Sequence, residues 1–446
     1  MRKTATKLSA ILLLMFVFLL NGNCASALAK EKYIRVGLSY GNGAVSSCSA
    51  VCDNGFMIAE AGPDGFEEIL RLPECKQITA SINSSRISAV DATGAVLYDG
   101  FGIDTCIIPI DFSSGGTIRY DGKPYRGGLC FYPAGNGRMN IINCIGLEDY
   151  LYGVLNSELG SQNPLEALKA QAVAARSFTV SNTGKHKGEG FDLCPDAHCQ
   201  VYKGYSDEYP ETNRAVDETS GLTLTYGGET VSGHYFKNSG GHTQSVSDVW
   251  GADAPYLTGV KDEYSPEYRW DYTMSFQEAG RKLEAAGYDI GKLKAAAITA
   301  RSLSGAVSSM EFTGARGTAE LKNERIRAVF GSVNIKSLNF SFRSGTAGEY
   351  SGQSEDVFIL GAGGAVGKLK PGDIYVLSGG VVSKMTDYRP VCDGEVETVT
   401  DGTIVFSGTG FGHGVGMPQD SAVEMADQGF SYDEILSYFF TGISIQ

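Results

Sequence analysis

The sequence has few basic residues for its length. Lys and Arg total 37 against 51 Asp and Glu, which gives a formal net charge of −14 over 446 residues. A protein that binds nucleic acid or anionic lipid without regard to sequence needs an excess of positive charge. The charge balance therefore argues against both kinds of partner and favours a neutral or locally cationic ligand.

Long apolar runs are also scarce. The run near the N-terminus extends from Ala10 to Leu20, shorter than the roughly 20 residues with which a helix spans a bilayer. Basic residues precede it and a small-x-small pattern follows it: Arg2, Lys3 and Lys7, then Ala27-Leu28-Ala29. Residues 1–29 are therefore predicted to be a signal peptide, and the protein to be extracytoplasmic. An uncleaved N-terminal anchor is the alternative.

Cysteine is present in a number that does not suit a disulfide scaffold. Nine cysteines remain after the predicted signal peptide: Cys48, Cys52, Cys75, Cys106, Cys130, Cys144, Cys194, Cys199 and Cys392. An odd number cannot form a closed disulfide framework. We expect most of them to be buried small hydrophobic residues or free thiols.

The order of strand-like and helical patterns predicts an α+β protein without internal repeats. Apolar residues alternate from Tyr33 to Tyr40, and similar short runs continue to about Tyr132, which predicts a β-rich N-terminal domain over residues 31–133. Residues 134–270 and 395–446 are expected to form the main, catalytic core. They include a hairpin that turns at Gly227-Gly228. Residues 271–394 are interpreted as an inserted, β-rich module.

Two helices are predicted within this core. The first spans about Leu147 to Leu155. The second begins near Pro164, with Asn163 as its cap and Glu166 completing a capping box.

Glu158 lies between these helices, where a side chain can project into a cleft. Leu155 and Leu159 are its neighbours, so partial burial would raise its pKa, as a general acid needs. Glu158 is therefore a candidate catalytic acid. An exposed loop carboxylate without function is the alternative.

A second candidate site combines two histidines and two cysteines within 14 residues: His186, Cys194, His198 and Cys199. Two imidazoles and two thiolates are an adequate tetrahedral set for zinc, and a closed set of four protein ligands would be structural. The alternatives are a Cys194–Cys199 disulfide, or free thiols beside solvated histidines.

The third candidate is a run of alternating glycines from Gly408 to Gly416 that contains His413. Glycines let the backbone turn and let a ligand or strand approach closely. The lysine of a phosphate-binding loop is absent. A lone histidine is usually structural, but His413, with Gln419 close behind it, is positioned in the sequence to hydrogen-bond a ligand.

These segments together resemble the stage II sporulation protein D/LytB family. Two runs match its hallmark nearly residue for residue: NCIGLEDYLYGVLNSEL from Asn143 and PLEALKAQAVAARSF from Pro164. Later motifs follow in the family's order: Gln200–Gly204, Asn238–Thr243, Val249–Gly251 with Pro255–Leu257, and Gly410–Met417. Departures from the pattern at Asn156, Leu159, Phe411 and Pro418 remove no ionisable group.

The resemblance implies a peptidoglycan lytic transglycosylase at the cell wall, secreted or membrane-associated. It places the acid/base on Glu158, and it implies that the enzyme cuts the bond between N-acetylmuramic acid and N-acetylglucosamine in peptide-stripped glycan strands, leaving 1,6-anhydro products. It further implies a role in sporulation, engulfment or wall remodelling, and a cell-wall amidase as a partner. Some relatives carry zinc near the cleft, where the cysteine and histidine cluster falls.

The remaining residues expected to line a sugar cleft come from the later motifs: Tyr202, Tyr235, Ser239, Gly240, Gly241, His413 and Gln419. Tyrosine faces stack on sugars, but these tyrosines would serve equally well in the core. Two other functions stay open. One is a non-catalytic enhancer of an amidase, and the other is a zinc amidase that uses the cluster as a catalytic site.

Overall fold

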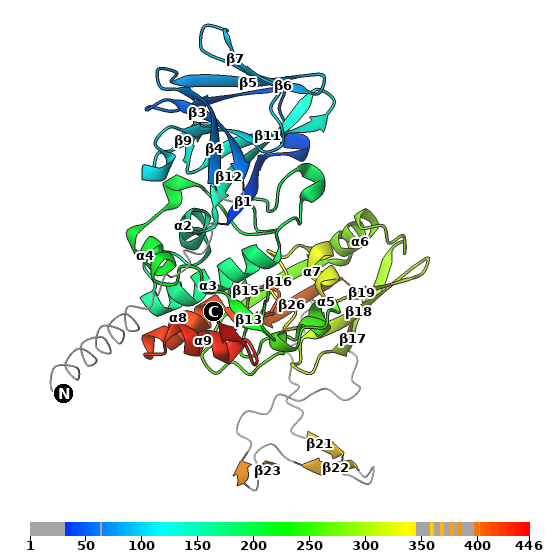
Figure 1. Ribbon diagram of the computed structural model, residues 1–446. Coiled ribbons are helices and arrows are strands. Elements are labelled where there is room, and N and C mark those ends of the chain that lie inside the picture. The colour runs from blue at the N-terminus through cyan, green and yellow to red at the C-terminus, as the bar shows by residue number, and fades with distance from the viewer. Residues whose placement is uncertain are drawn as a thin grey trace, which may run out of the picture. The chain divides into compact units, whose positions relative to one another are not determined.

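The computed structural model describes residues 32–62, 65–344, 397–400 and 402–446, and the backbone of four short strands between residues 357 and 384. The predicted signal peptide and Cys392 lie outside the described residues. The chain divides into two compact units. The first runs to Gly233 and takes in Ile443–Gln446, and the second is His234–Gly442. Helices and strands both build the chain, which confirms the predicted α+β class (Figure 1).

Two antiparallel sheets of six strands form much of the first unit. In order across the first sheet, the strands are β1 (Tyr33–Ser39), β12 (Arg138–Gly146), β11 (Gly128–Gly135), β8 (Thr105–Pro109), β3 (Phe56–Gly62) and β4 (Gly65–Leu72). Those of the second are β10 (Lys123–Tyr125), β9 (Ile118–Tyr120), β2 (Ser47–Val51), β5 (Gln77–Asn83), β6 (Arg86–Val90) and β7 (Val96–Asp99). Ile34 and Val36 of β1 are fully buried, as the alternating pattern predicts.

The expected domain boundary at residues 133 and 134 falls inside the hairpin of β11 and β12. These strands pair from Gly128 opposite Cys144 to Gly135 opposite Arg138, with a register shift between Pro133 and Gly135. β12 then leads directly into the first helix of the candidate site. The β-rich N-terminal part and the helices that follow it therefore belong to one unit.

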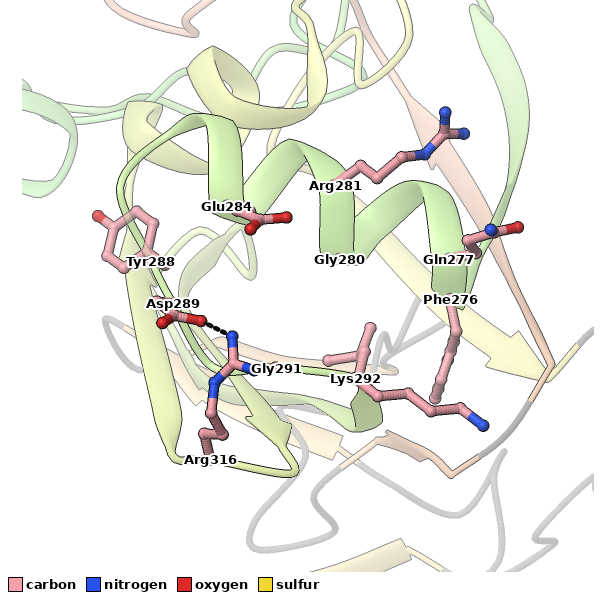
Figure 2. Close-up of a pocket in the computed structure, with 11 residues that line it drawn as sticks. Phe276, Gln277, Gly280, Arg281, Glu284, Tyr288, Asp289, Gly291, Lys292 and Arg316 are labelled. Atoms are coloured by element: carbon pink, nitrogen blue, oxygen red, sulfur yellow. Dashed lines mark hydrogen bonds and ion pairs between the residues drawn. The ribbon is translucent and has the colours of Figure 1, made fainter.

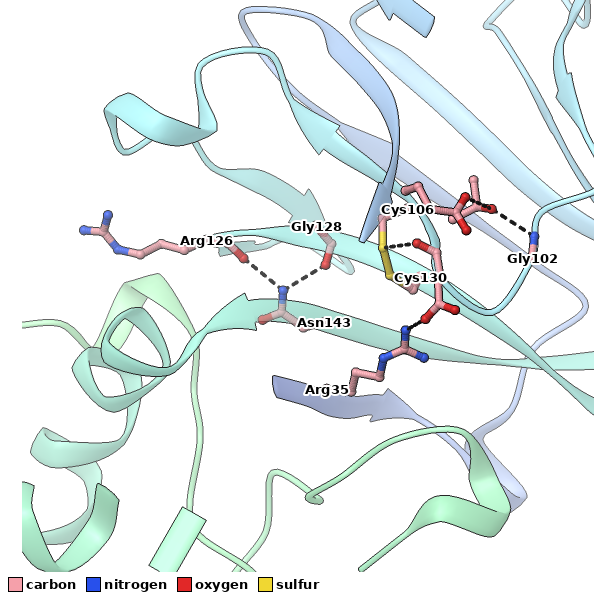
Figure 3. Close-up of a disulfide and its surroundings, with 10 residues drawn as sticks. Arg35, Gly102, Cys106, Arg126, Gly128, Cys130 and Asn143 are labelled. Carbon is pink, nitrogen blue, oxygen red and sulfur yellow. Dashed lines mark hydrogen bonds and ion pairs between the residues drawn. A yellow bond between two sulfur atoms is a disulfide. The ribbon is translucent and has the colours of Figure 1, made fainter. Parts of the chain in front are cut away.

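One disulfide joins β8 and β11 (Figure 3). Cys106 and Cys130 are directly opposite in the register of these strands, where side chains approach closely. The other described cysteines are free, as expected for most of them: Cys48, Cys52, Cys75, Cys144, Cys194 and Cys199.

Among its described residues, the first unit has three α-helices: α2 (Leu147–Glu158), α3 (Leu165–Ser181) and α4 (Pro210–Glu218). The predicted capping box is wrong. The Asn163 side-chain amide donates to the carbonyl of Gly160 (3.2 Å), and Glu166 pairs with Lys169 (2.9 Å). α3 is buried on most sides, because its alanine-rich sequence lets neighbours approach closely.

A glycine turn joins β13 (Leu224–Tyr226) to β14 (Glu229–Thr230), as predicted. Gly227 and Gly228 both adopt positive φ, +63° and +89°, which a tight primed turn requires. β13 also pairs with β28 (Ser444–Ile445) at the end of the chain.

The second unit is built around two small antiparallel sheets. The three-stranded sheet contains β16 (Arg269–Ser275), β26 (Thr403–Thr409) and β20 (Phe340–Ser344), and the four-stranded sheet contains β19 (Thr318–Lys322), β18 (Val307–Gly314), β17 (Leu293–Arg301) and β25 (Thr398–Val399). The α-helices in the part of this unit that the structure describes are α5 (Val246–Trp250), α6 (Phe276–Ala285), α7 (Glu324–Phe330), α8 (Gln419–Asp427) and α9 (Tyr432–Phe439).

Residues 271–344 share a sheet and a hydrophobic core with a strand from beyond residue 395. β26, which was expected in the catalytic core, is the central strand between β16 and β20. Phe406 of β26 is fully buried in a hydrophobic cluster that includes Phe312 of β18 and Phe330 of α7. The strand after residue 395 therefore completes the core of the preceding segment. In the described part of the chain, no helix is both long and apolar enough to cross a membrane.

Candidate functional site

Glu158 is the last residue of α2, which runs three residues beyond its predicted end at Leu155. Its side chain is partly exposed. The backbone N–H of Val201 donates to Glu158 Oε1 at 2.8 Å. A fixed backbone donor therefore orients a carboxyl group that solvent reaches.

The last turn of α2 is held by Asp207. Asn156 Nδ2 donates to Asp207 Oδ1 (3.1 Å), and the Ser157 hydroxyl donates to Asp207 Oδ2 (2.5 Å). The two residues before Glu158 are therefore tied to a second segment, so that the position of Glu158 does not depend on the helix end alone.

Gln200 fixes the segment that carries the Val201 donor. Its side-chain oxygen accepts from the hydroxyls of Tyr150 (3.2 Å) and Thr179 (2.7 Å), and its amide donates to the Ala175 carbonyl (3.3 Å). Burial raises the pKa of Tyr150 well above its usual range, so Tyr150 remains a hydroxyl donor. This buried network keeps the Val201 N–H in place.

Tyr202 lies in the core rather than on the surface. Only 5% of it is exposed, and its hydroxyl donates to Asn143 Oδ1 at 2.7 Å. The Asn143 amide in turn donates to the carbonyls of Arg126 and Gly128 (Figure 3). The structure thus gives Tyr202 a packing role in the core, and its part in sugar binding stays a prediction.

The cysteine and histidine cluster is brought together as the spacing predicts. Ligand atoms of His186, Cys194, His198 and Cys199 all lie within 4.8 Å of one another. Cys194 Sγ is 3.4 Å from His198 Nδ1, and Cys199 Sγ is 3.5 Å from His186 Nε2 and 3.6 Å from His198 Nδ1. A tetrahedral zinc ion sets sulfur and nitrogen ligands about 3.5 Å apart. The four side chains therefore fit zinc.

The surroundings of the cluster also suit a metal. Glu189 Oε2 lies 3.0 Å from His186 Nδ1, which leaves Nε2 directed at the cluster. A carboxylate on the outer nitrogen is the common partner of a zinc-bound histidine. Cys194 and Cys199 are free thiols, so the alternative disulfide is not formed. Burial raises the pKa of Cys199, and metal binding would therefore release a proton.

The glycine run of the second unit passes close to the loop that contains Asn238 and Gly240. Asn238 and Phe411 exchange backbone hydrogen bonds of 2.9 and 2.8 Å. A Cβ on Gly240 would lie 2.9 Å from the backbone of Thr409, and one on Gly410 would lie 2.9 Å from the Asn238 carbonyl. Both glycines have positive φ. The crossing therefore requires glycine on each side.

Ser239 supports this crossing from inside the protein. It is 6% exposed, and its hydroxyl donates to Asp262, which also accepts from Ser421 (2.6 Å). This hydrogen bond thus stabilises the loop that carries Ser239. Gly241, by contrast, has open space where a Cβ would lie.

His413 is packed within the glycine run. Its Nδ1 accepts from the Val415 N–H (3.0 Å). Burial lowers the pKa of His413 to about 3, and a hydrogen bond with the Tyr235 backbone opposes that shift only in part. His413 therefore joins the run to β15 (Tyr235–Phe236), which pairs in parallel with β27 (Met417–Pro418). Its role in substrate binding stays a prediction.

Tyr235 lies within this pairing, opposite Met417, and Gln419 follows β27 directly. Tyr235 is partly exposed in β15, and Gln419 is 5% exposed at the start of α8. The structure thus gathers the candidate residues of the second unit around one loop crossing, and places Glu158, Tyr202 and the cysteine and histidine cluster in the first unit.

Trp250 is a residue that the sequence analysis did not select for the site. It is 42% exposed, and its ring centroid lies 5.0 Å from that of His413 and 4.9 Å from that of His234. Gly251, in the left-handed conformation, ends α5 immediately after it. Trp250 is one of only two tryptophans and falls in the Val249–Gly251 motif, and both facts were available signals. The packing holds an exposed aromatic surface in a fixed orientation.

Comparison with known proteins relates the chain to two groups of proteins. Residues 135–226 match the family described as Stage II sporulation protein, SpoIID, and residues 256–367 match a domain of unknown function, DUF8618. The amidase enhancer of Bacillus subtilis (strain 168) is 31% identical over 77% of this chain. The stage II sporulation protein D of Bacillus amyloliquefaciens is 28% identical over 68% of this chain and 74% of its own length.

The stage II sporulation protein D of Bacillus subtilis (strain 168) is also 28% identical, with the same coverage. The chain spans about half the length, 47%, of the amidase enhancer. The SpoIID match contains both α2 and α3 with Glu158 and the cysteine and histidine cluster. The resemblance in the hallmark runs is thus confirmed: the chain carries a SpoIID domain and is similar to stage II sporulation protein D and to the amidase enhancer.

Proposed function

We propose that the protein is an exported lytic transglycosylase that cleaves peptidoglycan glycan strands, with Glu158 as its acid/base. The observation that carries the proposal is the position of Glu158: a partly exposed carboxyl at the end of a helix, oriented by the Val201 N–H. A group that gives and then takes a proton must be held in one place and reach the substrate.

The proposed reaction uses this single carboxyl group twice. Protonated Glu158 donates its proton to the oxygen that links N-acetylmuramic acid to N-acetylglucosamine, and the bond from that oxygen to the muramyl C1 breaks. The carboxylate then takes the proton of the muramyl 6-hydroxyl, whose oxygen bonds to C1. The product is a 1,6-anhydro sugar, no water is consumed, and Glu158 regains its proton. Most glycosidases need two carboxylates for their reaction.

The second unit would contribute to glycan binding through Trp250. Its exposed ring offers an apolar face and an indole N–H, a combination suited to a sugar ring with hydroxyls on its rim. His413 and His234 support this ring from within the protein. Tyr235, Gly241 and Gln419 are further candidates around the same crossing.

Zinc would have a structural role in the first unit. His186, Cys194, His198 and Cys199 would supply all four ligands, which leaves no open position for a catalytic water. This geometry favours a structural ion and counts against the zinc amidase alternative. Cys199 is two residues before Val201, so a metal there would also steady the donor to Glu158.

A second function follows from the relative that is named an amidase enhancer. In that case the chain would bind an amidase or its substrate without cutting glycan. The export, the cell-wall location and the amidase partner are common to both proposals. Only the first requires Glu158 to transfer protons.

Incubation of the purified protein with glycan strands stripped of their peptides distinguishes the two proposed functions. The transglycosylase proposal expects anhydro-muramyl products by mass spectrometry. Intact strands, with faster peptide release when a cell-wall amidase is added, would favour the enhancer.

A further inference from the structure

A hollow of about 550 Å³ lies in the second unit between α6 and the start of β17 (Figure 2). It is within residues 256–367, the part that matches a domain of unknown function. Hollows of a few hundred Å³ are of the size that holds small ligands.

One face of α6 forms the upper wall of the hollow. Gln277, Gly280, Arg281 and Glu284 all line it, and their spacing places them on a single side of the helix. Ala279 and Leu283 are fully buried on another side, in the hydrophobic core. One face of α6 therefore packs in the hydrophobic core, and another face lines the hollow.

Gly280 lies in the middle of this exposed face. A glycine inside a helix costs about 1 kcal/mol relative to alanine. A Cβ at Gly280 would meet no atom within 4 Å, so packing does not require glycine there. The missing side chain instead keeps the hollow open.

The charges around the hollow are only partly matched. Arg316 forms an ion pair with Asp289 at one end. Within the described residues, the side chains of Arg281, Glu284 and Lys292 form no ion pair or hydrogen bond. Figure 2 shows Glu284 entering from the helix and Lys292 extending below it toward Phe276. One cation, Lys292, and one anion, Glu284, are thus available to a ligand in the hollow, whereas the Arg281 side chain extends away from it (Figure 2).

The rest of the wall is apolar. The rings of Phe276 and Tyr288 line the hollow and are themselves packed against the core, which keeps them in place. Leu293, at the start of β17, is 4% exposed and adds an aliphatic surface. A ligand with an alkyl part and charges of both signs would match these surfaces.

We propose that this hollow binds a short peptide with a free carboxylate and a free amine, the chemistry of a peptidoglycan stem peptide. Lys292 receives the carboxylate, Glu284 receives the ammonium group, and Phe276 and Tyr288 contact the aliphatic part. The choice of a stem peptide rests on the proposed function at the cell wall. The binding itself is separate from cleavage by Glu158.

Isothermal titration of the purified chain with the free tetrapeptide Ala-Glu-Lys-Ala, with the stereochemistry and γ-linkage of a stem peptide, tests this. Saturable binding is expected, weakened about tenfold by Lys292→Gln or Glu284→Gln, which corresponds to about 1.4 kcal/mol. Lys294→Gln, at an exposed lysine of β17 two residues further along that does not line the hollow, is the matched control and should bind as the wild type does.

Gly280→Leu gives an independent readout. Leucine favours a helix more than glycine does, so the melting temperature should not fall, whereas its side chain would occupy the hollow and abolish binding. Glycan cleavage by this variant should equal that of the wild type, so this proposal and the proposed reaction can fail separately.

Three results would overturn the proposal: no saturable binding of the tetrapeptide, equal losses for Lys292→Gln and Lys294→Gln, or undiminished binding by Gly280→Leu. Binding of inorganic polyphosphate in place of the peptide would also contradict it, because a polyanion does not need Glu284.

Discussion

The backbone N–H of Val201 donates to Glu158 Oε1 at 2.8 Å, and Val201 follows the cysteine and histidine cluster by two residues. The segment that orients the candidate acid is therefore also the segment that a metal would stabilise. This relationship links a structural ion to catalysis without placing the ion in the reaction.

The first prediction concerns that ion. Purified protein should contain about one zinc per chain, and Cys199→Ser should lower both the zinc content and the melting temperature, by about 5 °C or more. Elemental analysis and calorimetry measure the two. Cys75→Ser, a free and partly exposed thiol outside the cluster, should change neither. Undiminished zinc in Cys199→Ser would refute the ligand set.

The second prediction concerns the ion pair of Arg176 and Glu148. Arg176 is fully buried, and its Nε and Nη2 donate to the two carboxylate oxygens of Glu148 at 2.9 and 2.6 Å. Removal of one partner leaves a charge with poor solvation, so Arg176→Met should destabilise the first unit by about 3–5 kcal/mol in urea unfolding.

Arg214→Met is the matched control for this substitution. Arg214 also pairs with a glutamate, Glu218, at 2.6 Å, but its side chain is 64% exposed. Exposed pairs contribute at most about 1 kcal/mol. Equal effects of the two substitutions would mean that the buried pair does not hold α2 and α3 together.

The third prediction concerns pH and His413. Its pKa is about 3 in the folded protein against 6.5 as the ordinary value, because burial penalises the charged ring. Below about pH 6.5 the unfolded chain binds a proton that the folded chain does not, so stability falls with pH until about pH 3. His413→Gln removes this dependence. The melting temperature of the wild type minus that of the variant should therefore decrease from about pH 7.5 to about pH 4.5. A constant difference would show that His413 does not titrate in this way.

The fourth prediction concerns Trp250. Trp250→Ala should weaken binding of peptide-free glycan about tenfold, measured by titration with the catalytically silent Glu158→Gln protein as background. The melting temperature should change little, because 42% of the side chain is already exposed. Tyr209→Ala, at a similarly exposed aromatic residue (45%), should leave binding unchanged. Equal affinity of the two variants would remove Trp250 from the glycan site.

Features that depend on nearby residues could be predicted from the sequence. The turn at Gly227-Gly228 requires only two positive φ angles, and the ligand atoms of His186 to Cys199 meet because they lie within one short segment. The start of α3 was predicted, but not its cap, because Asn163 turns back to the preceding loop instead.

Features that depend on distant pairing could not be predicted. β26 joins β16 across more than 130 residues, as the hydrogen bond of Ser407 to Asp271 illustrates, and no local pattern shows which strands become neighbours. The exposure of individual side chains could not be predicted either. Tyr202 and Trp250 are both aromatic residues in family motifs. Tyr202 is buried and bonded to Asn143, whereas Trp250 is exposed to solvent.

The most direct test of the central claim is product analysis for Glu158→Gln with peptide-free glycan. The amide keeps the shape of the side chain but cannot donate and regain a proton, so anhydro-muramyl products should fall at least about 100-fold while the melting temperature is retained. Glu166→Gln, which alters a nearby carboxylate paired with Lys169, should cleave as the wild type does. A folded Glu158→Gln protein that still forms anhydro-muramyl products at the wild-type rate would contradict the assignment of Glu158 as the acid/base.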